Sequence, residues 1–554
     1  MSENKRKSNG FLVQGTILAA AGIITKIIGA IYRIPMLNIM GLQGQGYYDI
    51  AFQVYTIALM ISSYSLPLAV SKLVSARVAV GEKRNAYRIL KAALIFATTV
   101  GSIIMLGVYF GADFIATHLM GASVSSYALR VLAPGLLIVA IMGVLRGYFQ
   151  GLGTMVPTAI SQILEQIVNA VVSIVGAAML MSYGQEMAKR DGNTLLGPAY
   201  SAAGGTLGTV AGALIGLIFL VVCYYAYNGN MKKQIKRDPG NNLYGYKIIY
   251  KMLLLTIAPV VLSSAIYNIG NVLGSAMFNN IMSAQGHLEA ECVEQLGKIG
   301  QYYTLVNVPL AVANALGASM IPGLVGAYAC KDKNLLFNRI YMAVRYTMLI
   351  AIPSAFGFFA IGKPILDFIW PSVENSVQGM MLKVGAISLI FYSLSTITNA
   401  VLQGMNHMMK PVKNATITLV IQTAALFVML AVFKWGIFSV LFSKIIFSFC
   451  MCVLNARDIR NAVGYVQERE KTFYLPALAG LCMGIAAFFT HSVLDLFMNG
   501  RMPTLIAILV AIVVYSVCLL KFHALTEDEI LGLPKGATIL TICKKLHLIK
   551  NNMY

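Results

Sequence analysis

Stretches of roughly 20 mostly apolar residues recur along the whole chain, separated by short polar or Gly- and Pro-containing connections. A helix of about 20 residues crosses roughly 30 Å of hydrocarbon with its backbone hydrogen bonds satisfied internally. The pattern therefore predicts an all-α polytopic membrane protein with about fourteen transmembrane helices and no soluble domain. Their expected first residues are Phe11, Tyr47, Tyr87, Ala128, Pro157, Ser201, Tyr246, Tyr302, Ile340, Met381, Thr416, Ile437, Phe473 and Pro503.

Composition and charge placement refine this picture. Of 554 residues, 58% are hydrophobic and 11% are charged, which excludes an ordinary soluble protein. The formal net charge is +21, but most of the 42 Lys and Arg residues fall in alternate connections, the pattern of cytoplasmic loops. The positive charge thus indicates topology and not nucleic-acid binding. We expect a retained first span, both termini in the cytoplasm, and a location in the cytoplasmic membrane.

Two parts of the chain resemble each other. Residues 30–34 (AIYRI) match residues 265–269 (AIYNI), and residues 149–151 (FQG) match residues 402–404 (LQG). The offset of about 235 to 255 residues is close to six spans, which predicts two pseudo-symmetric six-helix lobes in parallel orientation with a substrate site between them. Chance similarity between apolar helices is the alternative. The expected division is a first lobe at 1–228, a second lobe at 229–456, two C-terminal helices within 457–524 and a cytoplasmic tail at 525–554.

Ionisable residues inside membrane spans are the main candidates for function, because each raises the free energy of membrane insertion by at least about 2.5 to 3.5 kcal/mol near the bilayer centre. In the first span, Gly22, Lys26, Gly29 and Arg33 recur every three or four residues, which places two cations on one helical face beside glycines. This face suits an anion. Snorkelling of the two side chains to the membrane interfaces is the alternative.

Four further charged residues are candidates for substrate binding. Asp49 opens the second span, and Lys72 lies at its cytoplasmic end, where snorkelling is the favoured interpretation. Arg146 ends the fourth span, and Glu165 lies in the fifth within a polar stripe. A structural ion pair between Arg146 and Glu165 is the alternative to a substrate contact.

The second half has polar stripes without charge. Asn268 lies in the seventh span and Asn399 in the tenth. Both are candidates for neutral hydrogen bonds to a sugar or peptide head group, with ordinary interhelical hydrogen bonding as the alternative. No catalytic residue and no metal ligand set is expected, because the cysteines in the spans lack His or acidic neighbours at metal-ligand spacing.

Four segments carry a family resemblance: residues 26–35 (KIIGAIYRIP), 46–49 (GYYD), 145–151 (LRGYFQG) and 531–536 (LGLPKG). With them the chain resembles the MurJ-type lipid II flippases of the multidrug/oligosaccharidyl-lipid/polysaccharide exporter (MOP) superfamily, most closely the stage V sporulation protein B branch. The resemblance covers nearly the whole chain.

The resemblance implies two six-helix lobes around a central cavity, two C-terminal helices forming a groove for a polyprenyl tail, and alternating access. It implies no cofactor, and coupling to the membrane potential or to a monovalent cation. The family's cavity cations correspond to Lys26 and Arg33, and its acid at the start of the second span corresponds to Asp49. The chain departs from the family in two respects: residues 58–65 carry no basic residue, and spans seven to twelve carry no clear mid-membrane acid.

The leading hypothesis is a flippase that moves lipid II, the undecaprenyl-pyrophosphate-linked peptidoglycan precursor, from the inner to the outer leaflet. The alternative cargo is another undecaprenyl-linked saccharide for capsule, teichoic acid or spore cortex. A membrane glycosyltransferase is the alternative from another class, with Glu186 and Asp191, or Glu289, Glu291 and Glu294, as its candidate carboxylates. Expected partners are the glycolipid, membrane lipids and the cell-wall synthesis machinery, with no nucleic acid.

Overall fold

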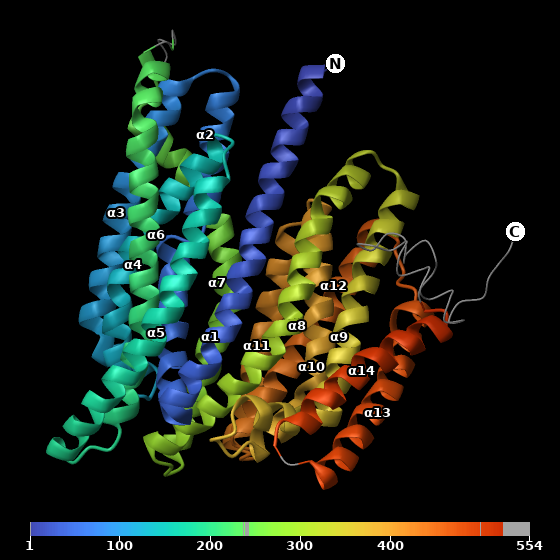
Figure 1. Ribbon diagram of the computed structural model, residues 1–554. Coiled ribbons are helices and arrows are strands. Elements are labelled where there is room, and N and C mark those ends of the chain that lie inside the picture. The colour runs from blue at the N-terminus through green and yellow to red at the C-terminus, as the bar shows by residue number, and fades with distance from the viewer. Residues whose placement is uncertain (1, 237, 239–242, 499, 525–554) are drawn as a thin grey trace, which may run out of the picture. The chain divides into compact units, whose positions relative to one another are not determined.

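Figure 1 shows the computed structural model, coloured from the N-terminus to the C-terminus. The structure describes residues 2–236, 238, 243–498 and 500–524. Every regular element in this part is helical, so the predicted all-α fold class is confirmed. The elements are α1 (Ser2–Ser62), α2 (Leu66–Ala79), α3 (Lys83–Phe114), η1 (Ile115–Leu119), α4 (Ser125–Gly151), α5 (Val156–Asp191), α6 (Leu196–Lys236), α7 (Tyr246–Ala284), α8 (Glu289–Ala329), α9 (Lys333–Ile369), α10 (Ser376–Gly404), α11 (Met409–Ala431), α12 (Ile437–Val463), η2 (Glu470–Tyr474), α13 (Leu475–Phe497) and α14 (Met502–Lys521).

The helices have the length and apolar character of membrane spans. Eleven helical stretches in the described ranges are long and apolar enough to cross a membrane, so the chain is a multi-pass membrane protein. One of them, Ala20–Ala79, is 60 residues long and includes the second expected start, Tyr47, together with part of the first predicted span, which was expected to begin at Phe11. Two expected helix starts, Tyr246 and Ile437, are the first residues of α7 and α12. The total of fourteen spans stays a prediction.

Helix α1 is interrupted at one residue. Gly41 has φ 66° and ψ −177°, a left-handed φ that glycine adopts without the steric cost of a Cβ. In the structure, the first and second predicted spans are therefore connected by a helix break at Gly41, within α1. We call residues 2–40 the first half of α1 and residues 42–62 the second half.

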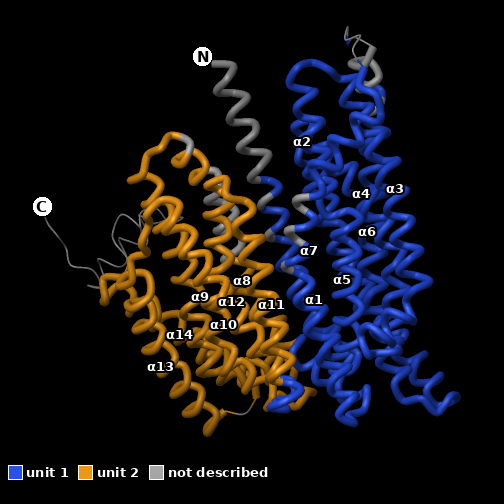
Figure 2. The backbone as a smooth tube through the Cα atoms, turned by 180° about the vertical axis from the view of Figure 1, so that it is seen from behind, with its two compact units in different colours: residues 1–300, 430–437 blue, residues 301–429, 438–554 orange. Residues whose placement is uncertain are grey.

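Residues 1–300 and 430–437 form one compact unit, blue in Figure 2. Within it, α5 and α6 pack with their backbones in contact. A Cβ on Gly204 of α6 would lie 2.1 Å from the carbonyl oxygen of Gly176 in α5. Gly208 continues the contact one turn later, where a Cβ would lie 2.5 Å from the carbonyl oxygen of Asn169. Small residues at every fourth position let membrane helices approach this closely.

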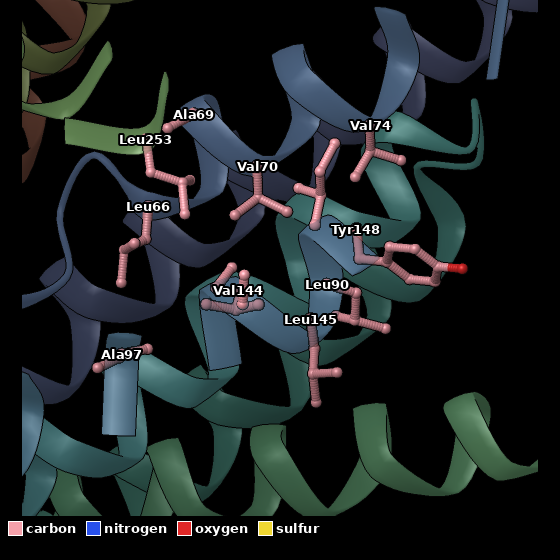
Figure 3. Packing of buried hydrophobic residues seen from close by; sticks show 14 of the residues in the cluster. Leu66, Ala69, Val70, Val74, Leu90, Ala97, Val144, Leu145, Tyr148 and Leu253 are labelled. Carbon is pink, nitrogen blue, oxygen red and sulfur yellow. The ribbon is translucent and has the colours of Figure 1, made fainter. Parts of the chain in front are cut away.

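A hydrophobic core in the same unit joins α2, α3, α4 and α7 (Figure 3). Gly147 lets α4 approach α2, because a Cβ there would lie 2.6 Å from the carbonyl oxygen of Pro67. In a membrane such a core is stabilised mainly by van der Waals contact, since lipid tails are as apolar as the side chains. The labelled members are Leu66, Ala69, Val70, Val74, Leu90, Ala97, Val144, Leu145, Tyr148 and Leu253.

Residues 301–429 and 438–554 form the second compact unit, orange in Figure 2. Within it, α13 and α14 pack on α9. The Arg345 side chain of α9, buried with only 2% exposure, donates to the hydroxyl of Tyr341 and to the backbone carbonyl of Ala524, just beyond α14. A buried guanidinium therefore fixes the end of α14 to α9. The buried apolar residues that pack α13 and α14 on α9 are Ile361, Met483, Ala487, Ala507 and Ala511.

The domain division expected from the sequence remains a prediction. Its boundaries at residues 228 and 456 follow from the internal repeat, whereas the two compact units follow from packing. The expected cytoplasmic tail, 525–554, lies outside the described residues.

Glu468 caps the segment that leads into α13. Its carboxylate accepts hydrogen bonds from the backbone N–H of Lys471 at 2.8 Å and from that of Thr472 at 3.0 Å. Burial raises the pKa of Glu468, but these donors outweigh burial and hold the pKa below its ordinary value. The ionised carboxylate thus stabilises this helix start.

We expect Glu468→Gln to lower the free energy of unfolding by about 1 kcal/mol near neutral pH, the usual contribution of a capping side chain. Because the folded-state pKa is depressed, this stabilisation is complete above the ordinary glutamate pKa of about 4.3 and is lost as the pH falls through the folded value. Thermal unfolding of detergent-purified protein at a series of pH values measures the difference. Glu470→Gln is the matched control, and equal effects of the two substitutions at every pH would refute the assignment.

Candidate functional site

The two cations predicted to share a face lie in the first half of α1. Lys26 is exposed, and the described part of the chain gives it no hydrogen-bond or ion-pair partner. Gly29 lies between the two cations on the same face. It is turned toward α5, because a Cβ there would lie 3.2 Å from Nε2 of Gln166. Arg33 is half-buried one turn further along.

Arg33 and Asp49 were predicted as separate candidates, and the structure places their charges within electrostatic range, although the described residues include no direct ion pair or hydrogen bond between the two. The Arg33 guanidinium interacts electrostatically with the Asp49 carboxylate and with the hydroxyl groups of Tyr32 and Tyr48. An unbroken α-helix would hold two residues sixteen positions apart at about 24 Å. The interaction therefore requires the chain to fold back at Gly41.

Asp49 is held by its own helix and by α8. Gln45 Nε2 donates to Asp49 Oδ2 at 2.7 Å. On the other side, a Cβ on Gly300 would lie 2.1 Å from the same oxygen, and a Cβ on Gly297 would lie 1.9 Å from the carbonyl oxygen of Leu42. The carboxylate thus packs directly on the α8 backbone. Sequence reasoning missed Gln45, Gly297 and Gly300, although a pair of glycines three positions apart is a signal for close helix approach.

Arg146 and Glu165 form an ion pair between α4 and α5. Arg146 donates from Nη2 to Glu165 Oε2 at 2.7 Å and from Nε to Ser161 Oγ at 3.0 Å. The two charged side chains are 12% and 26% exposed. The structural ion pair that we named as the alternative is therefore present, and a substrate contact by either residue stays a prediction.

We expect Arg146→Met alone to destabilise the chain by about 2 kcal/mol, below the 3 to 5 kcal/mol of a fully buried pair because this one is partly exposed. The reason is the Glu165 carboxylate left without its cation. Arg146→Met combined with Glu165→Leu should recover most of the loss, as measured by thermal unfolding in detergent. A double variant as unstable as Arg146→Met would contradict the ion-pair account.

The rest of the α5 polar stripe joins helices. Ser173 Oγ donates to the backbone carbonyl of Gly205 in α6 at 2.7 Å, and Asn169 Nδ2 donates to the Tyr32 hydroxyl at 3.4 Å. Both stripe residues are buried. The Asn169 bond links α5 to the tyrosine beside Arg33, so this part of the stripe supports the Arg33 region through packing.

Two other candidates lie outside these charge pairs. Lys72 of α2 is exposed, and no described residue forms an ion pair with it. Asn268 of α7 is half-buried and has interaction partners of its own. Their assignment to substrate binding stays a prediction.

Asn399 belongs to a buried polar network in the second unit. Asn455 Nδ2 of α12 donates to Asn399 Oδ1 at 2.8 Å, and Asn414 Nδ2 of α11 donates to Asn455 Oδ1 at 3.0 Å. Asn414 also donates to Asp458 Oδ2 at 2.9 Å, and Lys410 Nζ lies 3.1 Å from Asp458 Oδ1. Sequence reasoning missed the α11 and α12 members, because single amides in apolar helices give no periodic signal.

Three of the acids proposed for a glycosyltransferase, Glu289, Glu291 and Glu294, each have their own interaction partners. Glu289 accepts from the Ser123 hydroxyl at 2.8 Å and from the Tyr47 hydroxyl at 3.4 Å. Glu291 pairs with His287 and Glu294 with Lys298. Each acid thus makes a structural contact, with residues distant along the chain for Glu289 and with residues four positions away for Glu291 and Glu294. Across the described ranges, no group of three or more His, Cys, Asp or Glu side chains could hold a metal ion.

Long apolar helices that carry charged side chains within their spans define a multi-pass membrane protein. The chain belongs to the family described as "Polysaccharide biosynthesis protein", which it matches over residues 12–326.

Two curated proteins of Bacillus subtilis (strain 168) are similar in sequence. "Lipid II flippase MurJ" is 28% identical over 428 residues, which cover 74% of this chain and 75% of that protein. "Stage V sporulation protein B" is 25% identical over 529 residues, which cover 95% of this chain and 98% of that protein. The family resemblance stated from the sequence is confirmed.

Two solved structures share the fold. An inward-facing multidrug resistance MATE family transporter of the MOP superfamily matches with TM-score 0.63 and 16% identity, covering 80% of this chain and 94% of the other. Lipid II flippase MurJ in its inward closed conformation matches with TM-score 0.62 and 14% identity, covering 90% and 99%. At these identities the matches show the fold alone.

Proposed function

We propose that this chain is a flippase that carries lipid II from the cytoplasmic to the outer leaflet by alternating access, and that it is a transporter and not an enzyme. The observation that carries the proposal is the cationic face of the first half of α1. Lys26 and Arg33 lie in a stretch long enough to span a membrane. A cation there raises the free energy of membrane insertion, so its presence points to a functional role. The similarity to a lipid II flippase along most of the chain supports the same cargo.

Arg33 and Lys26 match the chemistry of a pyrophosphate. A guanidinium offers a planar fork of donors for two phosphate oxygens, and an ammonium adds a compact positive charge. In this proposal Asp49 supplies the negative charge that offsets Arg33 electrostatically before the cargo binds. The pyrophosphate takes over that charge when it binds.

The driving force in this proposal is the membrane potential. With the inside negative, outward movement lowers the free energy of an anion by about 2.3 kcal/mol per charge per 100 mV. No cofactor is required for this step. Coupling to a monovalent cation is the alternative source of energy.

Another undecaprenyl-linked saccharide is the second candidate cargo. Its support is the family to which the chain belongs, whose description, "Polysaccharide biosynthesis protein", names polysaccharides in general. The same cationic face would hold the pyrophosphate of either glycolipid, since the two cargoes share the undecaprenyl pyrophosphate and differ in the saccharide and its attached peptide.

A cargo competition in proteoliposomes tests this proposal. Labelled lipid II and a labelled undecaprenyl-pyrophosphate saccharide without the peptide are supplied on one face, and their arrival on the other face is followed by an impermeant enzyme or quencher. Faster translocation of lipid II is the expected result. A preference for the peptide-free saccharide would move the second cargo to the front.

The enzyme alternative is tested in the same vesicles. The triple variant Glu289→Ala, Glu291→Ala and Glu294→Ala loses structural contacts but should retain translocation per folded molecule, because the proposal assigns these acids no chemical role. Glycan polymer synthesised by the wild type and lost in this variant would refute the transporter assignment.

A further inference from the structure

The turn between α10 and α11 forms an open surface pocket of about 470 Å³, which we call the cavity. Two of its six lining residues are lysines and one is a histidine, and none is acidic. The cavity lies in a connection predicted to be cytoplasmic from its basic residues. Its lining residues are Asn406, His407, Met408, Met409, Lys410 and Lys413.

The backbone of this turn is fixed by its own hydrogen bonds. Asn406 has φ 63°, a left-handed conformation that asparagine tolerates better than most residues. The N–H of Asn406 donates to the carbonyl of Gln403 at 3.0 Å, and that of His407 donates to the carbonyl of Leu402 at 2.9 Å. These bonds close the end of α10, so the cavity wall is preformed.

The charge of the cavity is positive. The acid beside it, Asp458, is already engaged by Lys410 at 3.1 Å and by Asn414 at 2.9 Å. Lys413 is exposed, and the described part of the chain supplies no partner for its ammonium group. The site therefore holds one lysine fixed by an acid and one lysine available to an anion.

Two exposed methionines adjoin these cations. Met408 is 63% exposed and Met409 is 64% exposed. Large apolar side chains beside lysines at the end of a membrane helix are the pairing found where a protein surface meets both phosphate groups and acyl chains. A soluble anion would leave the methionines in water, whereas a phospholipid covers them.

We propose that this cavity binds the phosphate group of an anionic phospholipid of the cytoplasmic leaflet. Lys413 contacts the phosphate, Lys410 contributes charge from its position on Asp458, and the two methionines meet the upper acyl chains. The site is separate from the cargo site in α1 and does not depend on which glycolipid is translocated.

The test is lipid binding to the purified full-length chain in neutral detergent, measured by native mass spectrometry. Phosphatidylglycerol is titrated against phosphatidylcholine for the wild type, for Lys413→Gln and for Lys434→Gln. A lysine near an anionic surface contributes about 1 kcal/mol, which corresponds to about fivefold in affinity. We expect Lys413→Gln to bind phosphatidylglycerol about fivefold more weakly, with phosphatidylcholine binding unchanged.

Lys434→Gln is the matched control, because it removes the same charge from an exposed position beyond the other end of α11. It should bind phosphatidylglycerol like the wild type. An equal loss in both lysine variants, or equal binding of the two lipids by the wild type, would overturn the proposal. Binding of soluble glycerol 3-phosphate as tight as that of phosphatidylglycerol would also overturn it, since the site would then recognise free phosphate.

Discussion

Arg33→Gln should reduce translocation of the lipid-linked cargo by at least about tenfold, because a charge-assisted hydrogen bond contributes roughly 1.5 to 3 kcal/mol. The loss is expected in the transport step and not in membrane insertion. Arg33→Lys should retain part of the activity, since it keeps the charge but loses the planar fork. The measurement is the initial rate of cargo appearance on the far face of proteoliposomes, normalised to the amount of folded protein.

A second substitution at Asp49 distinguishes two possible roles of Arg33. If Arg33 serves only to neutralise Asp49, then Arg33→Gln combined with Asp49→Asn removes both charges and should restore translocation. The proposed function predicts that the double variant is stable but remains inactive, because the pyrophosphate has lost its cation. Arg130→Gln, which removes a partly exposed arginine of α4 that pairs with Asp113, is the control for loss of a charge and should remain active.

Gly204→Ala should destabilise the chain by at least about 3 kcal/mol, at the upper end of overpacking effects, and prevent accumulation of folded protein. The added methyl group would lie 2.1 Å from the carbonyl oxygen of Gly176 and 2.4 Å from its carbonyl carbon. Backbone atoms cannot rotate away as a flexible side chain can, so α5 and α6 must separate. Thermal unfolding and size-exclusion recovery in detergent measure the effect.

Gly229→Ala is the matched control on the same helix. A Cβ at Gly229 would meet nothing within 4 Å, so only the intrinsic helix preference changes, and alanine is favoured there by roughly 0.5 to 1 kcal/mol. The two substitutions should therefore change the free energy of unfolding in opposite directions: Gly204→Ala lowers it and Gly229→Ala raises it. Similar stabilities for both variants would mean that α5 and α6 are not in backbone contact.

The fold class followed from the sequence because membrane helices have a simple rule. An apolar stretch of about 20 residues must satisfy its backbone internally, so length and composition predict the helices. The expected starts at Tyr246 and Ile437 matched for that reason. The single-residue break at Gly41 was not predicted, because one glycine among many gives no signal that its φ will be left-handed.

The candidate site was predictable only in part. Periodicity placed Lys26 and Arg33 on one face, and chain proximity predicted the pair of Arg146 and Glu165, which the structure contains. The approach of Asp49 to Arg33 and to Gly300 depends on tertiary contacts between residues distant along the chain. Such contacts leave no local pattern in a single sequence.

The central claim is that the chain moves a polyprenyl-pyrophosphate glycolipid across a membrane. The most direct measurement is the appearance of labelled lipid II on the far face of proteoliposomes containing purified wild-type chain, with an inside-negative potential and with protein-free vesicles as the baseline. The account predicts translocation well above that baseline, and its loss in Arg33→Gln. A wild-type rate equal to that of protein-free vesicles, for lipid II and for other undecaprenyl-pyrophosphate saccharides alike, would contradict it.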